Sequence, residues 1–293
     1  MRHVLAVIGA AWLATPAAAA VPRVVTDFGP VESLVAQVMG DLGTPVMLLA
    51  LGADPHDFQM KPSQARALAE ADLVVWIGPE LTPALEHAVG ALGASAHAVG
   101  LLHQGGGAVR RFEDGGIDPH AWLDPTIAGQ WLATISAELA RQDPEHADTY
   151  AANAAAAGAA LVALDAELAA QLAPVRAVPF VVFHDALGYF ADHYGLRVAG
   201  AIELTDAAAP GAAQLAHIRG VLVEGGAVCV FPEAGRDPKF LATVAAGSGA
   251  RIGAAQDIEA ITLPPGPGQY AAMLRALAAT LTDCLTPSHH NQP

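Results

Sequence analysis

Short apolar runs alternate with alanine-rich stretches along this chain, and this alternation restricts the possible folds more than any other feature. Apolar runs bounded by glycine and proline are typical of strands buried in a parallel sheet, and the stretches between them suit crossover helices. The pattern occurs in both halves of the chain, which predicts two similar lobes. We expect strands at 23–27, 46–51, 73–77, 96–100, 180–183, 197–201, 227–231 and 250–254. We expect helices at 31–39, 63–70, 83–89, 186–193, 212–224, 238–246 and 268–285.

Between the two sets of strands lies the alanine-rich stretch 144–172. Alanine has the highest helix propensity, Asp143 suits the N-cap, and Pro144 suits the first helical position. A helix of this length would span about 43 Å, too long for one small lobe. We therefore expect an α/β fold of two (β/α)4-type lobes with parallel sheets, joined by a long rigid helix. The expected divisions are 21–142 for the N-terminal lobe, 143–173 for the linking helix and 174–293 for the C-terminal lobe.

The first twenty residues have the pattern of a cleavable signal peptide. Arg2 and His3 precede the apolar stretch 4–13, and three alanines stand immediately before Val21. Because the apolar stretch is short for a membrane span, we expect cleavage after residue 20, with an uncleaved anchor as the alternative. Residue 21 is not cysteine, so no lipid anchor is expected there. The pattern therefore predicts an exported protein.

The formal net charge is −15, from 29 acidic and 14 basic residues among 293. A surface this acidic argues against nucleic acid and against anionic lipid as partners. We expect a monomeric protein whose surface weakly attracts cations.

The sequence holds two cysteines, Cys229 in the predicted strand 227–231 and Cys284 near the end of the last predicted helix. Two cysteines in an exported protein often pair. A disulfide would fix that helix to the sheet and add about 2–4 kcal/mol of stability. Two buried free thiols are the alternative.

Three histidines follow predicted strands or lie in loops beyond them: His56, His120 and His184, spaced 64 residues apart. Such spacing is incompatible with a zinc finger or a His-Glu-x-x-His helix. Open α/β sheets bind ligands beyond the carboxyl ends of their strands, where distant loops meet. Each histidine alone is typical of a surface or hydrogen-bonded residue. Together they indicate a zinc site, because zinc favours neutral imidazole ligands.

Extended motifs surround these histidines. They include 52–58, 61–63, 72–74, 78–81, 118–125, 183–190 and 265–267. On these motifs the chain resembles, over residues 21–285, the metal-binding class of periplasmic solute-binding proteins of ABC transporters, in particular its zinc-specific branch. The Cys229/Cys284 pair also fits that class. The resemblance implies two lobes joined by a rigid helix, with one metal ion in the cleft between them and a membrane permease as partner.

The resemblance also assigns ligands to each lobe. His56 and His120 would come from the N-terminal lobe and His184 from the C-terminal lobe. Manganese-type members have a carboxylate where this chain has His184, and zinc-type members have a histidine. This difference agrees with the preference of manganese for oxygen ligands.

A fourth ligand is implied at Asp257, counted back from 265–267, although 257–260 departs from the usual family pattern. Some zinc members place a glutamate immediately before the first histidine, and here that residue is Pro55. A water molecule is the alternative to Asp257. A closed site of four protein ligands suits tight capture.

Two further groups of residues surround the predicted ligands. Ligating histidines usually donate their second N–H to a carboxylate or a carbonyl, and the candidate carboxylates are Glu203, Asp206 and Glu233. Loop 101–118 replaces a longer insertion found in many zinc members and carries His103, Glu113 and Asp114. These three could form a weak auxiliary site, but the glycines around them favour a mobile loop.

The sequence therefore predicts high-affinity binding of periplasmic Zn²⁺ and its delivery to an ABC-type importer, without catalysis. A periplasmic zinc metallochaperone is one alternative. A zinc-dependent hydrolase is another, since three histidines and a water also describe a hydrolytic centre. A hydrolase needs an open coordination position, which Asp257 as a fourth ligand would close.

Overall fold

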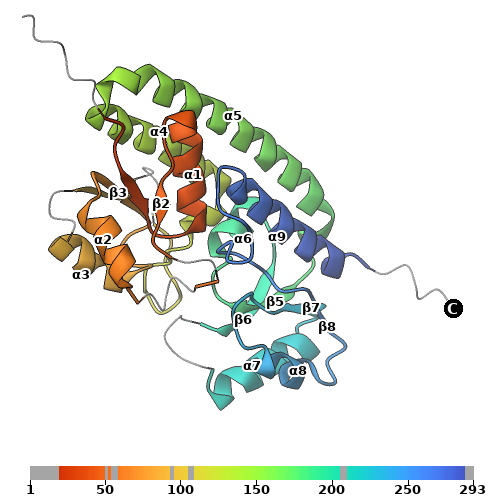
Figure 1. The fold of residues 1–293 in the computed structure, drawn as a ribbon. Coiled ribbons are helices and arrows are strands. Elements are labelled where there is room, and N and C mark those ends of the chain that lie inside the picture. Colours follow the sequence, from red (N-terminus) through yellow and green to blue (C-terminus); the bar gives the residue numbers. More distant parts are fainter. Residues whose placement is uncertain are drawn as a thin grey trace, which may run out of the picture.

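The computed structural model describes residues 20–49, 52–53, 59–92, 96–104, 109–204 and 210–287. Two α/β lobes lie end to end, and one long helix runs along both (Figure 1). This arrangement confirms the predicted fold class, including the parallel sheets and the long joining helix.

The N-terminal lobe is built on a four-stranded sheet with the order β2-β1-β3-β4. All its strand pairs are parallel, and Val24 and Val25 of the central strand lie opposite Leu73 and Val74. Strands β1 and β3 are buried on both faces, as their unbroken apolar sequences require. The strands are β1 (Val24–Thr26), β2 (Val46–Met47), β3 (Leu73–Trp76) and β4 (His97–Gly100). The helices are α1 (Gly29–Met39), α2 (Pro62–Ala69) and α3 (Pro83–Leu92).

The C-terminal lobe has a second four-stranded parallel sheet with the equivalent order β6-β5-β7-β8. Its strands are β5 (Phe180–His184), β6 (Val198–Glu203), β7 (Cys229–Phe231) and β8 (Arg251–Ile252). Its helices are α6 (Gly188–Tyr194), α7 (Ala212–Val223) and α8 (Lys239–Ala245). Because β5 is an inner strand, its last residue emerges at the middle of the carboxyl edge of the sheet. That residue is His184.

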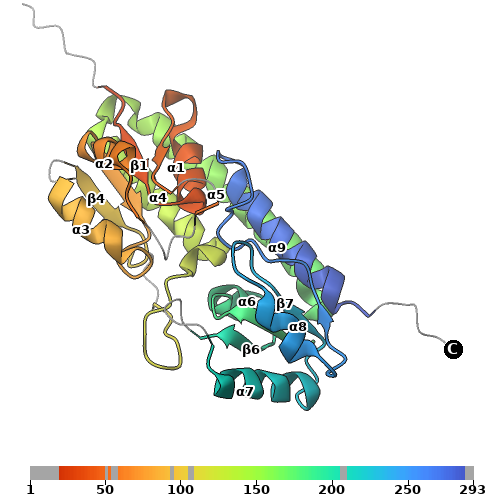
Figure 2. The ribbon, with the colours of Figure 1, turned by 60° about the horizontal axis from the view of Figure 1, so that its bottom comes forward.

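The joining helix is α5 (Ala147–Leu172), extended at each end by a 3-10 turn. One face is buried, through Tyr150, Ala157, Leu161, Leu164, Leu168 and Leu172. Each turn has a proline, Pro144 or Pro174, in its first two positions, and Pro174 cannot donate the backbone hydrogen bond that would continue α5. In Figure 1 the helix runs along the upper right side of the molecule with the C-terminal helix α9 (Gln269–Leu285) beside it, and in Figure 2 it lies behind α9.

Within the described part of the chain, one helical segment, Pro144–Val175, is long and apolar enough to cross a bilayer by length and composition. Its buried face packs against α1, α9 and a further helix, α4 (Pro125–Gln142). The high hydropathy comes mainly from alanine, which is compatible with both solvent and packing.

Helix α4 is absent from the elements expected from the sequence. Asp124 caps its start, since Oδ1 accepts hydrogen bonds from the backbone N–H groups of Thr126 and Ile127 at 2.7 and 3.4 Å. Pro125 occupies the first helical position, where its missing N–H costs nothing. Strand β2 ends at Met47, earlier than the expected 46–51, of which 50 and 51 lie outside the described residues. The N–H groups of Leu48 and Leu49 still donate to the carbonyls of Thr26 and Asp27, each at 2.8 Å.

The disulfide between Cys229 and Cys284 is present, as the sequence predicts. It joins β7 to α9, and α9 in turn packs against both α1 and α5. The largest hydrophobic core accordingly contains buried residues from both lobes. The two lobes therefore share a continuous apolar base along α5 and α9.

Candidate metal centre

His184 occupies the carboxyl end of β5 and is 1% exposed. Its backbone pairs with Glu203 of β6, and the N–H of Asp185 donates to the carbonyl of Glu203 at 3.0 Å. The Nδ1 atom of His184 lies 3.3 Å from Oε2 of the buried Glu233, which follows β7. Oε1 of Glu233 in turn lies 3.5 Å from Nε of Arg236.

His120 precedes a 3-10 turn at Ala121–Leu123 and is fully buried. Its Nδ1 lies 2.7 Å from Oδ1 of Asp118, and its backbone N–H donates to the same oxygen at 3.0 Å. The other oxygen of Asp118 accepts a hydrogen bond from Nη1 of Arg110 at 2.8 Å. The imidazole also packs on the ring of Trp122, with 5.1 Å between centroids.

The two imidazoles meet although they belong to different lobes. Their ring centroids are 4.9 Å apart, with an angle of 72° between the planes. In both, Nδ1 faces a carboxylate, and a carboxylate accepts a hydrogen bond only if that nitrogen carries the proton. The Nε2 atom of each ring is then the basic nitrogen, the one through which an imidazole of this tautomer binds a metal ion. The same arrangement, histidine to carboxylate to arginine, thus occurs once in each lobe.

The carboxylate beside His120 stays ionised despite its burial. Burial by itself would raise the pKa of Asp118, but hydrogen bonds and charges from His120 and Arg110 outweigh it and leave the pKa below its ordinary value. Burial raises the pKa of Asp185, which follows His184, and the nearby charge of Arg110 opposes that rise. The fixed negative charge of Asp118 makes Nε2 of His120 more basic and therefore a stronger ligand for a metal ion.

Asp257 lies in the loop after β8, and both of its oxygens are bound to that loop. Oδ1 accepts from the N–H of Ile261 at 2.8 Å, and Oδ2 accepts from the N–H and hydroxyl of Thr262 at 2.9 and 2.5 Å. In these positions the carboxylate closes its own turn. Among the residues that the structure describes, no group of three or more His, Cys, Asp or Glu side chains is arranged to hold a metal ion.

His56 lies outside the described residues, and so does Asp206. The start of the segment that carries His56 is nevertheless located, since the N–H of Gly52 donates to the carbonyl of Ile261 at 3.1 Å. Nε1 of Trp122 donates to the carbonyl of Ile258 at 2.8 Å. The loop of Asp257 therefore contacts both the segment leading to His56 and the residues directly after His120.

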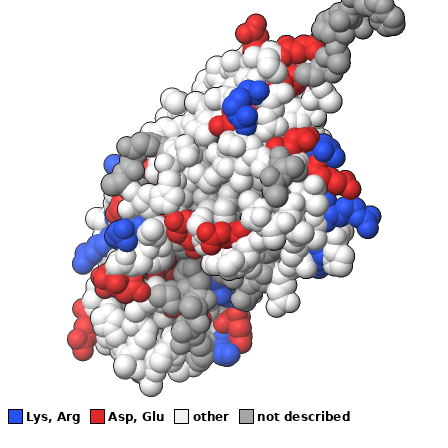
Figure 3. Space-filling model, turned by 90° about the vertical axis from the view of Figure 1, so that its left-hand side faces the viewer, with Lys and Arg blue, Asp and Glu red and all other residues white. Residues whose placement is uncertain are grey.

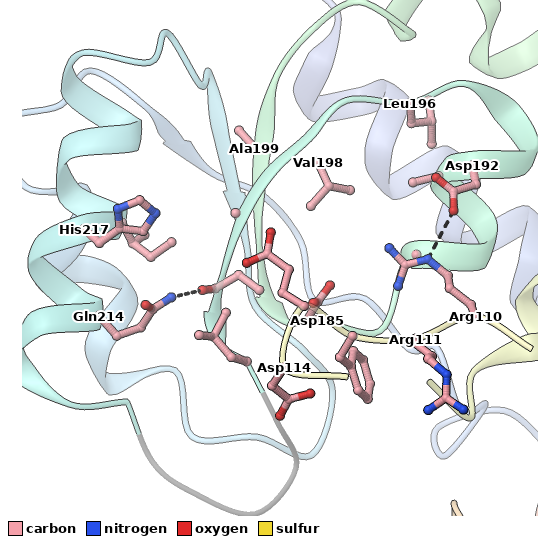
Figure 4. Close-up of a pocket in the computed structure, with 18 residues that line it drawn as sticks. Arg110, Arg111, Asp114, Asp185, Asp192, Leu196, Val198, Ala199, Gln214 and His217 are labelled. Carbon is pink, nitrogen blue, oxygen red and sulfur yellow. Dashed lines mark hydrogen bonds and ion pairs between the residues drawn. The ribbon is translucent and has the colours of Figure 1, made fainter. Parts of the chain in front are cut away.

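A cavity of about 800 Å³ lies beside this site (Figure 4). Loop residues 110–114 line one side of it, and β6, α6 and α7 line the others. Asp185 extends into it, so the cavity reaches the residue next to His184 (Figure 4). Glu113 and Asp114 line the cavity, whereas His103 pairs with Glu80 at 2.7 Å. The structure thus separates His103 from the other two residues of the predicted auxiliary site.

Acidic residues outnumber basic ones in the chain, 29 to 14. Figure 3 shows acidic side chains gathered across the middle of one face, with basic side chains fewer and scattered. This distribution follows from the excess of acids over bases in the sequence. A surface of this sign attracts cations and raises their local concentration.

Comparison with known proteins agrees with this geometry. The model of the ZnuA family, described as the periplasmic component A of zinc-uptake complexes, matches residues 24–284. The chain belongs to this family. It is 47% identical to the high-affinity zinc uptake system protein ZnuA of Paracoccus denitrificans (strain Pd 1222), over 93% of this chain and 94% of that protein.

Solved structures of the family have the same fold. A crystal structure of ZnuA is 29% identical, with a TM-score of 0.80, and the match covers 90% of this chain and 100% of that one. A deletion mutant of ZnuA with zinc bound is 27% identical, with a TM-score of 0.79, over 91% of this chain and 99% of that one. The family is one of periplasmic components of zinc-uptake systems.

Some of the residues that support the histidines are among the candidates expected from the sequence, and others are not. Of the three candidate carboxylates, Glu233 faces the side chain of His184. Glu203 pairs with His184 through the backbone of the neighbouring strand. Asp118 is not among those candidates, although it stands two residues before His120 in the motif 118–125. Arg110 and Arg236 carry no local pattern that marks them, because their roles depend on which carboxylates the fold places beside them.

Proposed function

We propose that this protein captures Zn²⁺ between its two lobes in the periplasm and delivers it to the membrane permease of an ABC-type importer. The observation that carries the proposal is the meeting of His120 and His184 from opposite lobes, each with its Nδ1 facing a buried carboxylate. Zinc is the cargo that two such imidazoles favour over manganese. The ZnuA name of the relatives supports the same cargo.

His56 completes a set of three histidine ligands in this proposal. The fourth position belongs to a water molecule or to Asp257. The hydrogen bonds from Ile261 and Thr262 to Asp257 favour water, because ligation would require the carboxylate to exchange part of them for the metal ion. Three imidazoles and a replaceable water suit a carrier that must also release its cargo.

The export, processing and domain organisation that we propose follow from the sequence. Residues 1–20 direct export and are removed after residue 20. The mature chain works as a monomer with lobes at 21–142 and 174–293 joined by 143–173. No catalysed reaction is part of the proposal.

Zinc titration of the purified mature protein against a chelating dye tests the proposal. His120→Ala and His184→Ala should weaken binding by more than the roughly 10–100-fold typical of residues behind the ligands. His87→Ala, which removes an exposed histidine on α3, should leave the affinity unchanged. Unchanged affinity in His184→Ala would refute the site.

Delivery needs a separate assay. Zinc-loaded protein should stimulate the ATPase of its reconstituted permease, and His184→Ala should not at the same zinc concentration. Zinc binding without stimulation would instead support the metallochaperone alternative. Hydrolysis of ester or amide substrates by the zinc form would support the enzyme alternative.

A further inference from the structure

Arg110 connects the two lobes directly. It lies in the loop that leads to His120, yet most of its contacts are with α6 of the C-terminal lobe. Its Nε donates to Oδ2 of Asp192 at 3.1 Å (Figure 4), and its backbone N–H donates to the hydroxyl of Tyr189 at 2.8 Å. Its Nη1 meanwhile donates to Asp118, the carboxylate that holds His120. One side chain therefore touches both the support of His120 and the helix that follows His184.

We infer that Arg110 is a positioning residue for zinc capture, which holds Asp118 and His120 in place against the C-terminal lobe. The inference rests on the proposed zinc-binding function and assigns a role within it to a residue outside the ligand set. Arg110 acts through Asp118, because Asp118 divides its two oxygens between His120 and Arg110. Without the guanidinium, one oxygen of a fully buried carboxylate would lose its partner.

The packing of the guanidinium explains a glycine on α6. A Cβ atom placed on Gly188 would lie 2.1 Å from Cζ and 2.2 Å from Nη1 of Arg110. The planar guanidinium thus lies directly on the first turn of α6, four residues after His184. Any larger residue at 188 would displace the end of the arginine side chain.

The two ion pairs of Arg110 differ in strength. Asp118 is fully buried, whereas the side chain of Asp192 is 74% exposed. Water screens the exposed pair, so the contact with Asp118 dominates. The fork of the guanidinium reaches both carboxylates at once from one fixed plane, which the single ammonium of lysine does not.

Charge and geometry predict opposite results for the loss of Arg110. A guanidinium near the site repels a divalent cation, so removing only its charge would strengthen zinc binding. Removing a positioning contact weakens it, because His120 is then less well oriented before the metal arrives. The sign of the change therefore separates the two effects.

The experiment compares Arg110→Gln, Arg110→Lys and Gly188→Ala with Arg111→Gln, by zinc titration against a chelating dye. Arg111 bonds the carbonyl of Gly115, so its variant removes the same charge from the same loop without touching Asp118. We expect Arg110→Gln to raise the zinc dissociation constant about tenfold, at the lower end of the range for residues behind a ligand. Arg110→Lys and Gly188→Ala should change it in the same direction.

A double-mutant cycle with Asp118→Asn distinguishes positioning from general loosening of the fold. If Arg110 acts through Asp118, Arg110→Gln should add little to the loss caused by Asp118→Asn. Fully additive losses would overturn the inference, and so would an Arg110→Gln protein that binds zinc as tightly as Arg111→Gln or more tightly. Gly188→Ala keeps every charged group and tests the inference even if Arg110→Gln does not fold. Failure of the proposed function is distinct, since the unmodified protein would then not bind zinc.

Discussion

Nδ1 of His120 lies 2.7 Å from Oδ1 of Asp118, and both side chains are completely buried. Nδ1 of His184 is farther from its carboxylate, at 3.3 Å from Glu233. The shorter and more deeply buried contact fixes the ring of His120 more strongly, since a charged hydrogen bond gains strength as water is excluded. The two lobes thus support their histidines in the same way but to different degrees.

Asp118→Asn should weaken zinc binding by about 10–100-fold, because the amide neither keeps the charge nor the ion pair with Arg110. Zinc titration at constant pH measures the change. The matched control is Asp114→Asn in the same loop, where the carboxylate accepts a hydrogen bond from the N–H of Gly116. Equal affinities for the two variants would mean that the carboxylate beside His120 contributes nothing to binding.

Glu233→Gln should weaken zinc binding in the same direction but by less than Asp118→Asn. The contact with His184 is longer, and Arg236 lies 3.5 Å from the glutamate rather than within ordinary hydrogen-bond distance. The same titration ranks the two variants. A larger loss of zinc affinity in Glu233→Gln would mean that the carboxylate beside His184 contributes more to binding than the one beside His120.

The inner strands β1, β3, β5 and β7 could be predicted because they are buried throughout, and a strand buried on both faces needs a continuous apolar run. The ends of the strands could not be predicted. Strand β2, for example, ends where its pairing with β1 ends, and that pairing depends on both segments. Helix α4 was predictable in principle: Asp124 and Pro125 are a strong start, followed by the apolar stripe of Trp131, Ile135 and Leu139.

The candidate site also contains residues that could be predicted from the sequence and residues that could not. His120 and His184 stand out because imidazoles after strands of an α/β fold are chemically unusual and share an edge. Arg110 does not, because its partners Tyr189 and Asp192 lie 79 and 82 residues away and meet it only once the lobes are placed side by side. A contact between lobes leaves no periodic pattern in the sequence.

Asp257→Ala should lower the free energy of unfolding by about 1–3 kcal/mol, because it leaves two backbone N–H groups of the turn without their acceptor. Its zinc affinity should fall less than that of His184→Ala. Urea unfolding measures the first quantity and zinc titration the second. A loss of affinity as large as that of His184→Ala would instead identify Asp257 as the fourth ligand.

Reduction of the disulfide between Cys229 and Cys284 should lower the free energy of unfolding by about 2–4 kcal/mol, since it releases a closed loop in the unfolded chain. Urea unfolding with and without a reductant checks this, with the Cys229→Ser/Cys284→Ser protein as the control that no longer responds. Identical unfolding midpoints in the two conditions would show that the bridge does not stabilise the fold.

His193 should make stability depend on pH in the alkaline range. It lies on α6 with Nδ1 3.4 Å from Asp124 at the start of α4, and with Nε2 2.7 Å from Asp165 on α5. The hydrogen bond with Asp124, followed by that with Asp165, raises the pKa of His193 to about 9, although burial opposes the rise. The charged imidazole thus links both lobes to the joining helix at neutral pH.

Because the folded pKa of His193 lies above the ordinary value of 6.5, its contribution to stability is complete below pH 6.5. The contribution declines as the pH rises and is lost above about pH 9. His193→Gln should therefore be about 1–3 kcal/mol less stable than the unmodified protein at pH 6, with the difference shrinking towards pH 9.5. Urea unfolding across that range tests this, with exposed His217→Gln as control. A difference independent of pH would mean that His193 stabilises the junction as a neutral side chain.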